Sequence, residues 1–227
     1  VTVENAGPVS ATLVATAAGP LKHTTRITLD RAGDRVAIQN EIEQNFGDVR
    51  KWAFCFNLTN PIVHHEEVGA ILRADLSNTG GHYATVDCRY DWLTLNHFAD
   101  MSGKEGGITL SNWDCYFTQL GNSTVSNLDR GTPRLSVLAG GQVDSTSYGI
   151  RNQGGDSYFL QRFALRTRTA YNATEAMRFA LEHQNPLVAG PVTGGTAYPE
   201  KMFSLLGIDD PNVLAWAVKP AEDGIDK

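Results

Sequence analysis

The chain has 227 residues, and its 25 acidic residues against 19 Lys and Arg give a formal net charge of −6 at pH 7. This length is enough to bury one large core or two smaller ones. The sequence has no basic cluster that could follow phosphates and no apolar run near the ~18 residues of a membrane span. We therefore expect neither nucleic acid nor a membrane as a partner.

The first part of the chain shows the two-residue period of half-buried strands. Polar and apolar residues alternate over 24–29, and the alternation resumes over 36–43 after an Ala-Gly-Asp turn. Two such runs joined by a short Gly turn predict a β-hairpin. In the following run Trp52, Phe54 and Phe56 share one face, which predicts a strand with one aromatic side.

The later part of the chain predicts one more long strand and one helix. Residues 158–169 separate a Leu/Phe/Ala-rich face from an Arg/Thr-rich face, as a strand does. Apolar residues then recur at helical spacing and predict a short helix over about 174–184: Ala176, Met177, Ala180 and Leu181. Thr174 is the expected cap, and Asn185-Pro186 the expected stop.

Gly-Gly pairs punctuate the chain and mark many short connections between strands. About a dozen strands exceed what one open sheet carries comfortably, so the sequence predicts an all-β protein of two packed antiparallel sheets. Near the end of the chain, an Asp-Pro-Asn turn at 210–212 separates two apolar runs, which predicts a terminal pair of strands. Residues 213–218 are apolar at every position, which is typical of a strand covered on both faces.

Three cysteines are too few and too scattered for a disulfide framework or a zinc site, and we expect Cys55, Cys88 and Cys115 to be small buried residues. They leave the cellular compartment open. The single His/acid cluster is His64-His65-Glu66-Glu67. Adjacent residues on a strand point to opposite faces, so we expect a solvated loop or strand end here and no metal site.

Six segments, in order over about 210 residues, resemble the C-terminal region of glycoside hydrolase family 38, the α-mannosidases. They are 4–12 (ENAGPVSAT), 40–54 (NEIEQNF with KWAF), 92–112 (WLTLNHFAD with GGITLSN), 133–138 (PRLSVL), 185–187 (NPL) and 204–224, which ends in AEDG. In that family one more strand follows AEDG, so the whole span 1–227 resembles a piece of a larger enzyme. Trp113-Asp114-Cys115-Tyr116 and Ala139-Gly140-Gly141 depart from the family's commoner forms and indicate a divergent subgroup.

The resemblance implies a large antiparallel super-sandwich of the galactose mutarotase kind. It also implies a zinc-dependent retaining α-mannosidase as the intact protein, with the zinc ligands and the nucleophile in an N-terminal α/β domain outside this sequence. In that enzyme, residues 1–227 would support the catalytic domain and the substrate pocket. Alone, the chain is expected to hold no cofactor and to be inactive.

Sugars are held by aromatic faces and by planar amide or guanidinium donors that bridge hydroxyl groups. Two segments carry such groups, and we expect Trp113 and Asp114, at the end of a strand, and Arg151 and Gln153, in a polar loop, to contact substrate. The resemblance places an Arg near Arg151 close to the active site. A turn in which Arg151 pairs with Asp144 or Asp156 explains the same residues.

Two other functions fit the same fold. One is a free-standing carbohydrate-binding module, which an open reading frame beginning near Val1 would favour. The other is a mutarotase-like sugar epimerase, whose chemistry needs a His and a carboxylate on one concave face. His97 and Asp114 are the pair that the sequence offers. We also expect the terminal apolar strand, if one of its edges lacks a neighbour, to promote self-association into a homo-oligomer.

Overall fold

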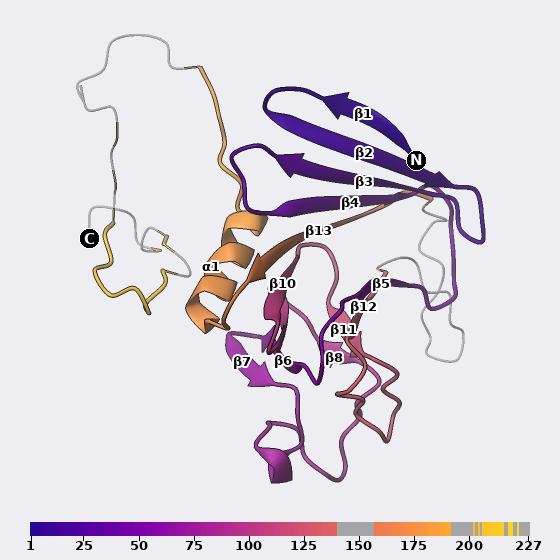
Figure 1. Cartoon of the computed structure of the whole chain (residues 1–227), viewed down its shortest axis with the longest axis vertical. Coiled ribbons are helices and arrows are strands. Elements are labelled where there is room, and N and C mark those ends of the chain that lie inside the picture. Colours follow the sequence, from indigo (N-terminus) through magenta and orange to yellow (C-terminus); the bar gives the residue numbers. More distant parts are fainter. Residues whose placement is uncertain are drawn as a thin grey trace. The chain divides into compact units, whose positions relative to one another are not determined.

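A computed structural model of the chain describes residues 1–139, 157–191, 202, 204, 206–215, 218–219 and 222. These residues form β-strands, one α-helix and one short 3-10 helix (Figure 1). The strands are β1 (Thr2–Ala6), β2 (Ser10–Ala17), β3 (His23–Asp30), β4 (Val36–Ile42), β5 (Lys51–Cys55), β6 (Ile62–Glu67), β7 (Ala70–Arg73), β8 (Leu93–Thr94), β9 (Phe98–Gly103), β10 (Gly106–Asn112), β11 (Phe117–Leu120), β12 (Arg134–Leu138) and β13 (Phe159–Arg168). The helices are η1 (Ser77–Thr79) and α1 (Ala173–Gln184).

The strands form two antiparallel sheets. The large sheet has nine strands in the order β1-β2-β3-β4-β13-β10-β9-β6-β7, and the small sheet has four in the order β5-β12-β11-β8. The chain divides into two compact units, Val1–Gln184 and Asn185–Lys227, and all of these strands lie in the first. None of the described helices is long and apolar enough to cross a membrane.

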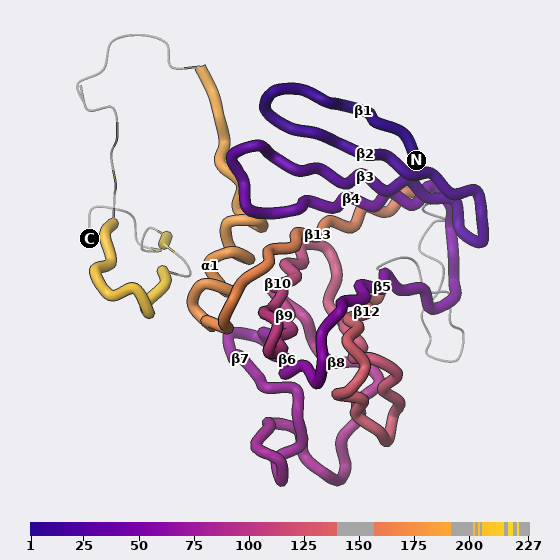
Figure 2. The backbone as a smooth tube through the Cα atoms, in the orientation of Figure 1, coloured from indigo at the N-terminus to yellow at the C-terminus, as the bar shows by residue number. Residues whose placement is uncertain are grey.

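The strands predicted from alternation are confirmed. β3 and β4 form the expected hairpin, in which Leu29 lies opposite Val36. The tube in Figure 2 shows β1 to β4 running back and forth at one end of the large sheet. β13 pairs with β4 on one side and with β10 on the other, so it lies inside the large sheet. The side chains of β13 therefore point alternately to the two faces of the large sheet, as the separation of its Leu/Phe/Ala-rich and Arg/Thr-rich sides predicts.

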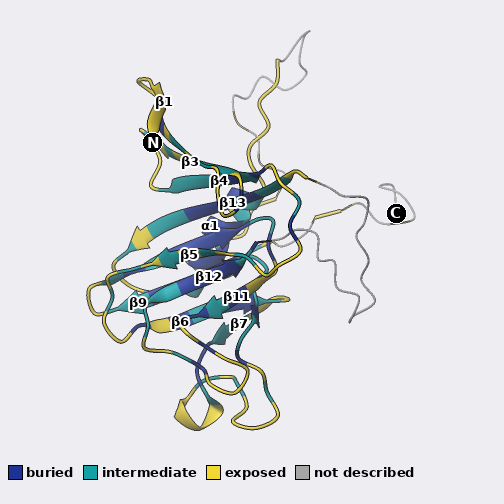
Figure 3. Ribbon diagram, turned by 90° about the vertical axis from the view of Figure 1, so that its right-hand side faces the viewer, coloured by how far each residue is buried: buried dark blue, intermediate teal, exposed yellow. Residues whose placement is uncertain are grey.

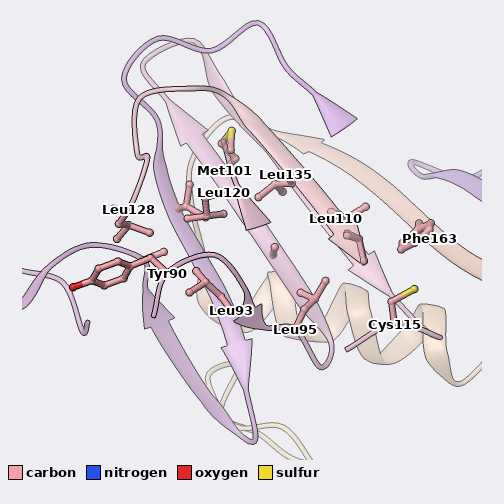
Figure 4. Packing of buried hydrophobic residues seen from close by; sticks show 14 residues of the cluster. Tyr90, Leu93, Leu95, Met101, Leu110, Cys115, Leu120, Leu128, Leu135 and Phe163 are labelled. Carbon is pink, nitrogen blue, oxygen red and sulfur yellow. The ribbon is translucent and has the colours of Figure 1, made fainter. Parts of the chain in front are cut away.

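The core lies between the two sheets, which confirms a sandwich. Phe163 and Leu110 from the large sheet and Leu135 and Leu120 from the small sheet belong to one buried cluster (Figure 4). The rings of Phe54 and Phe163 meet edge to face at 5.3 Å between centroids. The aromatic side of β5 is thus the side that packs on the large sheet, because alternation places Trp52, Phe54 and Phe56 together there.

The predicted helix is confirmed over Ala173–Gln184, but its predicted cap is wrong. The Asn172 side chain, not Thr174, accepts the backbone N–H of Glu175 at 3.0 Å, and this contact caps the first turn. The helix stops before Asn185-Pro186 as expected. Its buried residues include Phe179 and His183 in addition to Ala176, Met177 and Ala180, whereas Leu181 is only half-buried.

The predicted terminal strand pair is wrong for the described residues. The turn itself forms, because the backbone N–H of Val213 donates to the Asp210 carbonyl at 3.1 Å and that of Asn212 donates to the Asp210 side chain at 2.8 Å. The described residues on either side of it are not strands, and Leu206, Ile208, Val213 and Val218 are exposed. An apolar run shows that a segment favours burial, but pairing also needs a neighbouring strand.

Burial of all three cysteines was also a wrong prediction. Cys115 is buried in the core, Cys88 is half-buried and Cys55 is exposed on β5. Cys55 alternates with the core-facing Trp52 and Phe54, so its side chain lies on the outer face of the small sheet.

Candidate functional site

The two faces of the large sheet differ in chemistry. One face packs on the small sheet and is apolar. On the other face, directly opposed residues form a polar row across five neighbouring strands: Arg73, His64, Asp100, Thr109 and Arg166. Helix α1 packs over β9 and β10 on this side. We call this side of the large sheet the polar face. It includes every residue of the sheet whose side chain points to the same side as that row.

A Trp, an Asp and an Arg meet on the polar face. Trp113 and Asp114 directly follow β10, and Arg162 lies on the adjacent strand β13. The guanidinium of Arg162 binds Asp114 with both prongs, Nε to Oδ2 at 2.9 Å and Nη2 to Oδ1 at 2.7 Å. The backbone N–H of Arg162 donates to the same carboxylate at 2.7 Å. Arg162 also stacks on the Trp113 ring, 3.7 Å from its centroid.

We call Trp113, Asp114 and Arg162 the Trp113 cluster. Its two charges are partly open to solvent, since the side chains of Arg162 and Asp114 are 31% and 20% exposed. The hydrogen bond to Asp114 is the main cause of the raised pKa of Arg162, so the guanidinium stays charged. A fixed guanidinium fork and a carboxylate beside an indole can bind hydroxyl groups in a defined orientation.

The last turn of α1 closes one side of this cluster. The ring of His183 meets Trp113 edge to face at 5.6 Å, and its Nδ1 is 2.8 Å from the Ser111 hydroxyl. Burial lowers the pKa of His183 to about 4, so the imidazole is neutral near pH 7. The Gln184 side chain donates to the Asn96 carbonyl at 3.2 Å and ties the helix end to the sheet.

A second polar cluster surrounds Asp100, whose side chain is fully buried. Arg168 pairs with it through Nε at 2.7 Å and through Nη2, while the hydroxyls of Thr109 and Ser102 donate at 2.7 and 2.9 Å. Tyr171 stacks on His64 with ring centroids 4.1 Å apart. Burial raises the pKa of Tyr171 and lowers that of His64, so both side chains are neutral near pH 7.

The His64–Glu67 segment is not solvated, which corrects the sequence interpretation. It lies on β6, between β9 and β7, where His65 and Glu66 are buried. The two side chains have different partners. His65 bonds to the Thr94 carbonyl and the Tyr83 hydroxyl, while the Glu66 carboxylate accepts the backbone N–H and Nδ1–H of His97 at 3.0 and 2.7 Å. Within the described residues, no group of three or more His, Cys, Asp or Glu could hold a metal ion.

The structure brings only part of the predicted site together. Trp113 and Asp114 are joined by Arg162, which sequence reasoning missed although the Arg/Thr-rich face of residues 158–169 pointed to it. Of the proposed His97–Asp114 pair, His97 bonds to Glu66 and Asp114 bonds to Arg162. Arg151 and Gln153, together with Asp144 and Asp156, lie outside the described residues.

No protein family profile and no curated protein sequence matches this chain. Among solved structures, it is similar to an α-mannosidase from Enterococcus faecalis V583 with a TM-score of 0.58 and 11% identity. The match covers 82% of this chain but only 24% of that protein. The likeness concerns the fold. Lower-scoring neighbours are a galactose mutarotase related enzyme from Lactobacillus acidophilus (TM-score 0.35, 10% identity, 74% of this chain and 70% of that one) and a candidate aldose 1-epimerase from Escherichia coli K12 (0.37, 12%, 73% and 67%).

Proposed function

We propose that this chain is the β-sandwich region of a larger, family 38-like α-mannosidase. In that enzyme it supports the catalytic domain and contributes carbohydrate contacts from its polar face. The observation that carries the proposal is the agreement of two independent likenesses. Six sequence segments resemble the C-terminal region of that family in the correct order, and the fold of 82% of the chain is similar to about a quarter of an α-mannosidase.

The Trp113 cluster is the part of the polar face that we assign to carbohydrate. The Arg162 fork is held on one side by Asp114 and on the other by the indole, so few rotamers remain to be ordered when a hydroxyl binds. The carboxylate of the cluster, Asp114, is occupied by both prongs of Arg162, and the neighbouring His183 is neutral. The cluster therefore suits binding, and the zinc-dependent chemistry belongs to the catalytic domain of the parent enzyme.

The proposal is tested first on the parent polypeptide. The reading frame upstream of Val1 should encode a His-x-Asp motif after a first strand. The purified longer protein should hydrolyse an aryl α-mannoside and lose this activity to a chelator, with recovery on addition of zinc. A longer protein without α-mannosidase activity, or an open reading frame that begins near Val1, would refute the proposal.

The role of the Trp113 cluster is tested in the same enzyme with Arg162→Lys. This change keeps the charge but loses the two-pronged contact, so KM should rise about tenfold, in line with ~1–2 kcal/mol for a charge-assisted hydrogen bond. Arg26→Lys is the matched control, because Arg26 also lies in a strand of the large sheet and pairs with Glu4 and Glu41. Equal kinetics for the two variants would remove the cluster from the substrate site.

A free-standing carbohydrate-binding module remains the second candidate, because the Trp113 cluster is built by this chain alone. It predicts that the isolated chain binds mannosides by itself and that Arg162→Lys weakens this binding. The epimerase alternative has less support, since both oxygens of the buried Glu66 accept hydrogen bonds from within the protein and His97 is directed to Glu66.

A further inference from the structure

The first three strands of the large sheet carry an apolar face that no described residue of the unit Val1–Gln184 covers. Val3 lies opposite Leu13, Leu13 opposite Ile27 and Ile27 opposite Ile38, so their side chains form one row across the sheet. Ile38 packs against the core. Val3, Leu13 and Ile27 are 63%, 45% and 39% exposed, and Figure 3 shows exposed residues along β1.

This row continues the core face of the sheet. Ile38 lies opposite Phe163, which is fully buried between the two sheets. The small sheet has only four strands, and its end strand β5 reaches the start of β3, where the ring of Trp52 meets His23 at 5.3 Å. Beyond that point β1, β2 and β3 extend past the small sheet, and none of their apolar side chains is buried. We call this face of β1–β3 the overhang.

The overhang carries no acidic residue, Lys or Arg. In these strands the charged side chains lie on the other face, where Arg26 binds both Glu4 and Glu41. The apolar face shows Val, Leu, Ile, Ala and Thr instead, together with His23, whose ring packs edge to face against Trp52. A surface of this kind can pack against an identical surface without burying an unpaired charge, which would be unfavourable.

We propose that the overhang is the contact surface between two copies of this chain, related by a two-fold axis parallel to the sheets. In this arrangement the overhang of each copy covers the overhang of the other. The end strand β1 of one copy then comes alongside the end strand β5 of its partner. Among the described strands both are at sheet ends without a neighbour on one edge, and the symmetric arrangement places these two edges against the partner.

The size of the overhang predicts a weak dimer. Three strands of about seven residues, at ~4.8 Å between strands and ~3.3 Å per residue, cover roughly 14 by 23 Å, or about 330 Å² of face per copy. Stable interfaces bury about 1,200–2,000 Å² in total, so this contact falls in the transient class even when the β1 and β5 edges are added. Association should therefore depend on concentration in the micromolar range or above.

The experiment is sedimentation velocity of the full chain from about 1 to 500 µM, with reductant present because Cys55 is exposed. We expect a monomer–dimer equilibrium. Leu13→Lys should weaken it at least tenfold, since the dimer would bury a lysine from each copy. The matched control is Thr16→Lys, which places the same charge on the other face of the same strand and should leave the equilibrium unchanged.

Circular dichroism and thermal unfolding of the variants establish that each is folded, and Val3→Lys on the end strand replaces Leu13→Lys if the latter is not. An uncharged interface also predicts a dimer that persists from 0.05 to 1 M NaCl. The proposal is overturned by a wild-type chain that stays monomeric at 500 µM. It is equally overturned by a dimer that is weakened as much by Thr16→Lys as by the overhang variant, or one that dissociates in high salt.

Discussion

Replacing Asp100 by Asn should be among the most destabilising single changes on the polar face. Asp100 is fully buried, and its partner Arg168 is only 13% exposed. The Asn side chain has nearly the same shape, so packing is preserved. The change removes the negative charge. It also directs an amide NH₂ group at one of the two Arg168 nitrogens that donate to Asp100 in the wild-type chain.

The expected loss of stability follows from the Arg168 charge, which stays buried after the substitution. Breaking a buried ion pair by removing one partner costs about 3–5 kcal/mol, because the remaining charge is buried without compensation. Two further hydrogen bonds to Asp100, from Thr109 and Ser102, are weakened as well. For a chain of this size, 1 kcal/mol shifts the melting temperature by about 2–4 °C, so we expect a decrease of roughly 6–20 °C.

The assay is urea unfolding followed by tryptophan fluorescence, with calorimetry for the melting temperature. Glu43→Gln is the matched control, because Glu43 forms an exposed ion pair with Lys22 and solvent screens such pairs, so that they contribute little to stability. The double variant Asp100→Asn with Arg168→Met should be more stable than the sum of the two single changes predicts, since no unpaired charge then remains.

The reasoning is refuted if Asp100→Asn costs no more than Glu43→Gln. It is also refuted if the two single changes at Asp100 and Arg168 add without coupling, because the buried pair would then have no energetic link.

Three further outcomes are expected. Burial lowers the pKa of His183 from 6.5 to about 4. At pH values between these two, the unfolded chain binds a proton that the folded chain does not. The free energy of unfolding therefore falls as the pH drops from about 6.5 towards 4. His183→Asn should reduce this loss by up to about 3 kcal/mol in urea titrations at pH 4.5 and 7, and parallel curves would contradict it. Asn172→Ala should cost about 1 kcal/mol through the lost cap whereas Asn172→Asp should not, as thermal unfolding can measure. The isolated chain should neither hydrolyse an aryl α-mannoside nor bind zinc tightly; stoichiometric zinc by elemental analysis would show the reverse.

Local patterning predicted four strands, β3, β4, β5 and β13, and the helix α1. The alternation over 24–43 predicted the β3–β4 hairpin, and the helical spacing that begins at Ala176 predicted α1. Both signals depend on the side-chain period of a segment, which is a property of neighbouring residues alone. The same local reasoning predicted Thr174 as the cap, whereas Asn172 has that role. The residue at which a helix begins depends on local backbone geometry, which the spacing of apolar residues does not specify.

Pairing between distant strands could not be predicted in this way. The Arg/Thr-rich face of 158–169 predicted that arginines would gather on one side of a strand. Only the order of strands in the large sheet decided that Arg162 meets Asp114 and that Arg168 meets Asp100. The placement of β6 inside that sheet likewise buries Glu66, which the sequence had suggested was solvated.

The sequence by itself determined the strands β3, β4, β5 and β13 and which face of each is apolar, because both follow from the two-residue period of the pleated backbone. Tertiary structure alone decided how many strands each sheet contains. A nine-stranded sheet against a four-stranded one leaves the apolar face of β1–β3 uncovered, and no local pattern separates Ile27, which is exposed, from Ile38, which packs on the core. Burial depends on what lies opposite a residue, and that is set by contacts far apart in the chain.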